Sequence, residues 1–91
     1  MEVAFYATLR DVVGAKRVTF DLPPGSTVQD LLDEAGTRYP ALKPLIWEAD
    51  GRLRDYIKVF VDGRESRLLQ GVETVLAADS TVDIFPPAAG G

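Results

Sequence analysis

One amphipathic helix between strand-like stretches is the feature that most limits how this chain can fold. From residue 28 to Tyr39, apolar residues recur at steps of three and four, so they share one helix face. Two pairs at its start have the spacing of a capping box, Ser26 with Gln29 and Thr27 with Asp30, and Pro40 forces an end near Tyr39. A helix with a single apolar face must pack on another layer, which the flanking strands can supply.

Stretches that alternate apolar and polar side chains lie on both sides of this helix, and the first two look like a hairpin. A second, shorter helix is expected over residues 42–49. The expected strands are residues 2–9, 17–22, 56–62, 65–68 and 81–85. This order predicts an α+β fold, a mixed sheet of about four to five strands packed on one main helix. The β-grasp is the named fold that suits it.

Composition restricts the chemistry that the chain can perform. Its 91 residues form one small domain, expected to span 1–85, with residues 86–91 as a tail. Because cysteine and histidine are absent, thiolate chemistry, imidazole catalysis and the usual zinc sites are excluded, and we expect no metal and no bound cofactor. The net charge of -4 disfavours nucleic acid and anionic membranes as partners. Without a membrane-spanning stretch or a basic leader, we expect a cytoplasmic protein.

The tail is the stretch most suited to chemistry. Its side chains are small or ring-locked: Pro86, Pro87, Ala88, Ala89, Gly90 and Gly91. Such a slim segment can pass between the walls of another protein and present the terminal carboxylate. A carboxylate is a poor electrophile until it is activated, and the chain has no phosphate-binding loop motif, so ATP would be used by a partner. The alternative is that the two glycines only end the chain, with no function.

Aromatic residues fall on the outward phase of three expected strands. In a β-grasp sheet the last strand lies between the first and third, so Tyr6, Phe60 and Phe85 could form one apolar patch beside the tail. We predict that this patch docks a partner, with Arg67 as a further contact. The alternative is that a loop or the second helix covers it.

The chain as a whole resembles the MoaD family of sulfur carriers. The resemblance rests on "FYATLR" at 5–10, Gly14, "TVQDLL" at 27–32, "YPAL" at 39–42 and "DIFPPAAGG" at 83–91. It implies a ubiquitin-like carrier, not an enzyme, whose Gly91 is adenylated by a MoeB-like enzyme and converted to a thiocarboxylate. It also implies that the tail enters the large subunit of molybdopterin synthase, or another sulfur acceptor, with Gly90 and Gly91 as the family's double glycine.

One segment departs from the strict molybdopterin branch. Residues 53–76 carry an extended strand and turn followed by an R-x-L-x-G pattern, which resembles CysO-like carriers and archaeal small modifier proteins. Molybdopterin biosynthesis is therefore the first expectation for the pathway. A CysO-like or tRNA-thiolation carrier, a modifier that forms isopeptide bonds, and a passive ubiquitin-like interaction module stay as alternatives.

Overall fold

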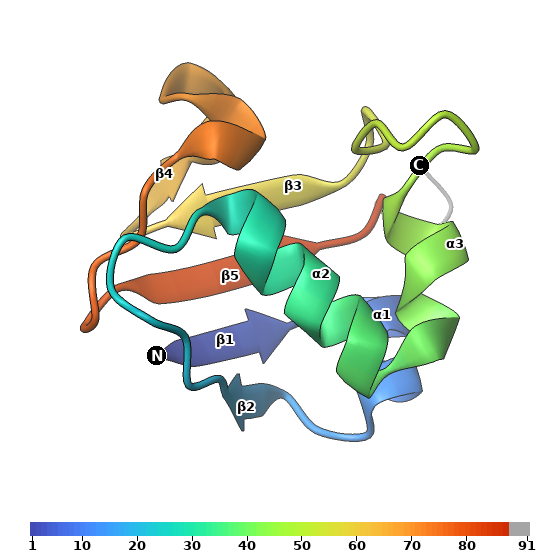
Figure 1. Ribbon diagram of the computed structural model, residues 1–91. Coiled ribbons are helices and arrows are strands. Elements are labelled where there is room, and N and C mark those ends of the chain that lie inside the picture. Colours follow the sequence, from blue (N-terminus) through green and yellow to red (C-terminus); the bar gives the residue numbers. More distant parts are fainter. Residues whose placement is uncertain (88–91) are drawn as a thin grey trace.

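The computed structural model describes residues 1–87 and places a sheet on one side of the molecule with helices packed across it (Figure 1). Within those residues the sheet has five strands in the order β2-β1-β5-β3-β4. The elements are β1 (Glu2–Phe5), α1 (Ala7–Val13), β2 (Arg17–Thr19), α2 (Val28–Arg38), η1 (Pro40–Leu42), α3 (Lys43–Ile46), β3 (Lys58–Val61), β4 (Arg64–Glu65), η2 (Ser66–Leu68), η3 (Gly71–Glu73) and β5 (Thr81–Phe85).

The sheet is mixed, as the sequence predicts. β1 and β5 are parallel neighbours in its interior, with Phe5 opposite Ile84. β1 pairs antiparallel with β2, and β3 pairs antiparallel with both β5 and β4. The last strand therefore lies between the first and the third, which confirms the strand arrangement on which the aromatic patch depends.

Helix α2 crosses one face of the sheet and covers the core. Its buried residues are Val28, Leu31, Leu32, Ala35 and Gly36, and they pack on side chains from the inner sheet face such as Val3, Phe5, Val59, Val82 and Ile84. Of the two expected capping pairs, Thr27 with Asp30 forms the box: the Asp30 N–H donates to Thr27 Oγ1 (3.2 Å), and the Thr27 N–H donates to Asp30 Oδ2 (3.0 Å). The Ser26 hydroxyl donates to the Pro23 carbonyl oxygen instead (2.6 Å). A cap of this kind stabilises a helix by about 1 kcal/mol. The alignment of apolar face and cap explains why this element was predicted correctly.

The expectation of one strand over residues 2–9 is wrong after Phe5. The backbone turns sharply at Ala7, where φ is 49°, and helix α1 follows until Gly14, whose φ of 84° forms a left-handed cap. Leu9 is buried as expected, but it reaches the core from a helix. Phe5 and Leu9 are four residues apart, and this spacing fits one face of a strand as well as one face of a helix. The apolar pattern therefore predicted a strand where a helix forms.

Among the remaining expected elements, β5 has the expected bounds and the others are shorter than expected. β2 ends at Thr19, the strand expected over 56–62 is β3, and the return strand is only β4, followed by η2. The second helix is split into η1 and α3. The apolar stripe expected along it, Leu42, Leu45, Ile46 and Ala49, is only partly buried, since Leu45 is 37% exposed. Pro44 can occupy only the first turn of a helix, so α3 starts beside it rather than continuing from η1. Among the described residues, no helix has the length and apolarity needed to cross a membrane.

Candidate functional site

Three aromatic rings meet on the face of the sheet that the helices leave open. The rings of Tyr6 and Phe85 are stacked, with centroids 4.2 Å apart and planes 14° apart. The ring of Phe60 meets Phe85 edge-on, at 5.5 Å and 83°. All three side chains are half-buried, and no loop covers them completely. We call Tyr6, Phe60 and Phe85 the aromatic cluster; its formation confirms that the three residues lie together.

The cluster forms one wall of a hollow of about 360 Å³, which Lys58, Gly63 and Asp83 complete. Asp83 Oδ1 accepts a hydrogen bond of 2.9 Å from the Tyr6 hydroxyl. This hydrogen bond, with desolvation and the charge of the carboxylate, raises the pKa of the Tyr6 phenol. The hollow therefore offers an apolar surface with a lysine on one side and a carboxylate on the other.

Strand phase explains how the sequence builds this hollow. Lys58 and Phe60 alternate with buried residues along β3, and Asp83 and Phe85 do the same along β5. The sheet register then sets Lys58 opposite Phe85 and Phe60 opposite Asp83. Lys58 and Asp83 were missed as site residues, although each lies two positions from a predicted aromatic residue and so shares its face.

The predicted tail begins directly beside the cluster. Pro86 follows Phe85 and is half-buried, and Pro87 is exposed. Ala88, Ala89, Gly90 and Gly91 lie outside the described residues. The exit of the chain next to the open rings means that a protein bound to the cluster is also close to the start of the tail.

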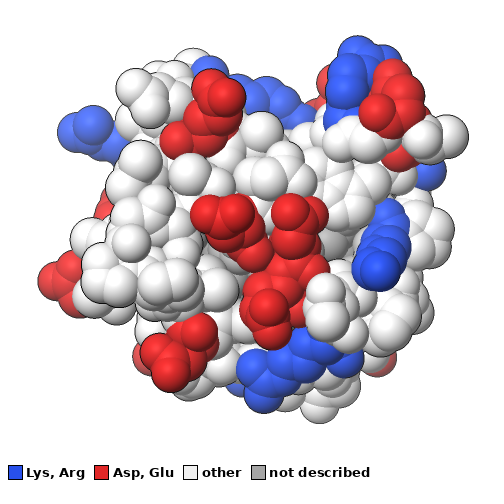
Figure 2. Space-filling model, viewed as in Figure 1, with Lys and Arg blue, Asp and Glu red and all other residues white. Residues whose placement is uncertain are grey.

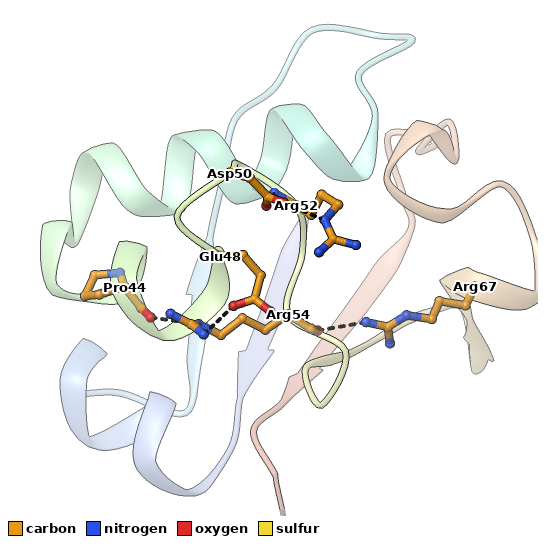
Figure 3. Close-up of polar contacts among 6 residues, drawn as sticks. All are labelled: Pro44, Glu48, Asp50, Arg52, Arg54 and Arg67. Carbon is orange, nitrogen blue, oxygen red and sulfur yellow. Dashed lines mark hydrogen bonds and ion pairs between the residues drawn. The ribbon is translucent and has the colours of Figure 1, made fainter.

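Arg67 is engaged within the chain (Figure 3). Its guanidinium donates to the carbonyl oxygens of Ile57 (2.7 Å) and Arg54 (2.8 Å) and lies 3.5 Å from a Glu65 oxygen. It therefore ties η2 to the segment that leads into β3. Its contact with a partner stays a prediction, but the structure shows an internal role that sequence reasoning missed.

Arg54 makes a second internal connection in the same region. It donates to the Pro44 carbonyl oxygen (3.0 Å) and to Glu48 (2.6 Å), as Figure 3 shows. These two arginines add side-chain contacts to an irregular segment, from α3 to β3, that is otherwise held by turn hydrogen bonds and the Trp47–Leu53 bridge. No periodic signal in the sequence marks such a contact.

Acidic side chains are prominent on the helical side of the molecule. In the view of Figure 2, acidic side chains gather over α2, where Asp30, Asp33 and Glu34 are exposed. The aromatic cluster lies on the opposite side of the sheet, where β3 and β5 present Phe60 and Phe85 and where Tyr6 directly follows β1. The helical side is thus an acidic, solvated surface, and the open sheet face is the better candidate for an apolar contact.

The sequence model of the ThiS family matches residues 3–91. The chain belongs to the ThiS family. Its match spans the aromatic cluster and the double glycine, so both features lie within the family's domain. The family match, together with a CysO structure from Amycolatopsis orientalis that is 27% identical over 99% of this chain and 98% of the other (TM-score 0.84), confirms the resemblance to ubiquitin-like sulfur carriers.

Individual relatives agree with this assignment. Small archaeal modifier protein 3 of Haloferax volcanii is 36% identical over 91 residues, which cover 100% of this chain and 98% of the relative. A protein of Archaeoglobus fulgidus named as a sulfur carrier is 41% identical over 46 residues, 50% of this chain and 52% of its own length.

The solved structures agree as well. The crystal structure of small archaeal modifier protein 1 from Haloferax volcanii superposes with a TM-score of 0.89 at 32% identity, covering 99% of this chain and 97% of the other. This likeness confirms the ubiquitin-like β-grasp fold. The relatives are small ubiquitin-like carriers and modifiers rather than enzymes.

Proposed function

We propose that this chain carries sulfur on its own C-terminus. The single observation that supports this most strongly is that the family match extends through Gly91, so that the double glycine follows the last strand of a ubiquitin-like domain. The proposed sequence starts with a MoeB-like partner that uses ATP. The Gly91 carboxylate attacks the α-phosphorus and releases pyrophosphate, and a sulfur nucleophile then displaces AMP to leave a thiocarboxylate.

This chain's own contribution is presentation rather than catalysis. The described residues contain no group of three or more potential metal ligands, and the sequence has no phosphate-binding loop motif. The aromatic cluster supplies a docking surface close to the tail, and docking there delivers the carboxylate to the partner's reactive site. Because the activating partner would draw on cytoplasmic ATP, we propose that the chain acts in the cytoplasm.

The resemblance to the MoaD family supports one acceptor of the sulfur first. The first proposal is the large subunit of molybdopterin synthase, with the tail inserted into its active site. A second candidate, protein modification through isopeptide bonds, is favoured by the full-length likeness to small archaeal modifier protein 3. Both functions begin with the same adenylate and differ only in the nucleophile, sulfur or the amine of a lysine.

Intact-mass spectrometry after incubation with ATP, the organism's adenylating enzyme and a sulfur donor separates the two. A carrier gains the mass of one sulfur in place of one oxygen. A modifier yields conjugates heavier than the chain itself in the presence of acceptor proteins. A chain that keeps its original mass, with an enzyme shown to be active on ATP, contradicts both functions.

A further inference from the structure

A second hollow adjoins the aromatic one on the open sheet face. It has a volume of about 240 Å³ and is lined by Glu2, Ala4, Arg17, Thr81 and Asp83, with Val82. Ala4 forms its floor, because the register of the sheet sets this short side chain between Arg17 on β2 and Asp83 on β5. Asp83 lines both hollows and so forms the wall between them.

The second hollow, which we call the polar hollow, is lined by more negatively than positively charged side chains. Two carboxylates, Glu2 and Asp83, line it against the single guanidinium of Arg17. Within residues 1–87, no ion pair shorter than 4.0 Å includes any of these three side chains. Asp83 uses Oδ1 to accept from Tyr6, and Oδ2 makes no hydrogen bond with the described residues. One carboxylate oxygen beside the aromatic rings is therefore available to a donor from another molecule.

We infer that the polar hollow receives an arginine or lysine side chain of the docking partner, next to an apolar side chain that enters the aromatic hollow. This inference rests on the proposed function, because it describes the partner's surface at the same docking face. A cationic side chain over Ala4 gains a charge-assisted hydrogen bond from the half-buried Asp83, and Glu2 adds a second carboxylate at the rim.

Charge complementarity explains why the occupant is cationic. Among the residues that line the hollow, an anionic side chain would have only Arg17 as a partner and would lie near two carboxylates. Arg17 belongs to the edge strand β2, two strands from Asp83. Lys16 lies over the Tyr6 ring, with its Nζ 5.3 Å from the centroid, and within residues 1–87 it makes no ion pair with Asp83. Lys58 lies beyond Phe85, on the far side of the aromatic hollow.

The test measures the affinity of the full-length chain for the adenylating enzyme of the same organism at low and high salt. Asp83→Asn keeps an acceptor for Tyr6 while removing the charge, and it is combined with Glu2→Gln. The double variant is expected to bind about tenfold more weakly at low salt, with a reduced dependence on salt. The matched control is Glu73→Gln, an exposed carboxylate on η3, which is expected to leave affinity unchanged.

A steric variant tests the same hollow without changing charge. Ala4→Leu fills the floor and is expected to weaken binding at all salt concentrations, with thermal unfolding used to confirm the fold. Wild-type affinity for the double charge variant overturns the inference, and so does a larger loss with Arg17→Gln. If Phe85→Ser weakens binding while the hollow variants do not, only this inference fails. If Phe85→Ser also binds normally, the proposed docking face fails.

Discussion

Phe85 is the central ring of the aromatic cluster, and its removal has a predictable cost. It stacks on Tyr6 and makes an edge contact with Phe60. Each aromatic pair contributes about 0.5–1.5 kcal/mol beyond simple burial, so the two pairs together contribute about 1–3 kcal/mol. Phe85→Leu keeps an apolar side chain on the strand and removes both ring contacts. We expect it to lower the free energy of unfolding by that amount.

Urea unfolding of purified protein, followed by circular dichroism, measures this change. A double-mutant cycle with Tyr6→Leu isolates the stacked pair, for which we expect a coupling energy of about 0.5–1.5 kcal/mol. The matched control is Val75→Leu, an exposed apolar residue away from the cluster, for which we expect a change within about 0.5 kcal/mol. If Phe85→Leu is as stable as the control, or the coupling energy is zero, the rings do not pack as described.

Three further changes test other parts of the structure. Arg67→Ala removes the guanidinium that donates to the Ile57 carbonyl oxygen, so we expect the free energy of unfolding measured in urea to fall by about 1–3 kcal/mol. Wild-type stability of this variant would refute the internal role of the side chain. Thr27→Ala removes one half of the capping box and should lower stability by about 1 kcal/mol, again measured in urea. Because its pKa is raised, the Tyr6 phenol stabilises the fold fully below the pKa of an unfolded tyrosine, and this contribution is lost as pH rises through the folded pKa. Ultraviolet titration should show one tyrosine ionising late, and Asp83→Ala should remove that delay; identical curves would contradict the hydrogen bond.

The parts of the fold that could be predicted are those in which several sequence signals agree. For α2, the apolar spacing, the capping box and Pro40 all indicate the same helix. Alternation along β5 placed Val82 and Ile84 in the core, where they are almost fully buried. The α1 helix was missed because it is only seven residues long and follows a backbone turn at Ala7. Alanine is not a residue type that indicates a turn, so nothing in the sequence indicated it.

The candidate site was predictable to a similar degree. Strand phase and the order of strands in the sheet were enough to bring Phe60 and Phe85 together. Tyr6 joins them although β1 ends at Phe5, because its N–H still donates to the Ile84 carbonyl oxygen (3.2 Å) as the next residue of the strand would. The roles of Arg67 and Asp83 depend on contacts between distant parts of the chain, which periodicity does not encode. Asp83, for example, meets the Tyr6 hydroxyl across 77 positions of sequence.

The location of the sulfur atom tests the central claim most directly. No lysine or arginine follows Arg67, so trypsin releases the C-terminal peptide 68–91 intact. After incubation with ATP, the adenylating enzyme and a sulfur donor, tandem mass spectrometry of this peptide should place one sulfur, in exchange for one oxygen, on Gly91. The chain lacking Gly91 should stay unmodified under the same conditions. Sulfur at any other residue, or none on a chain that the enzyme has adenylated, would contradict the account.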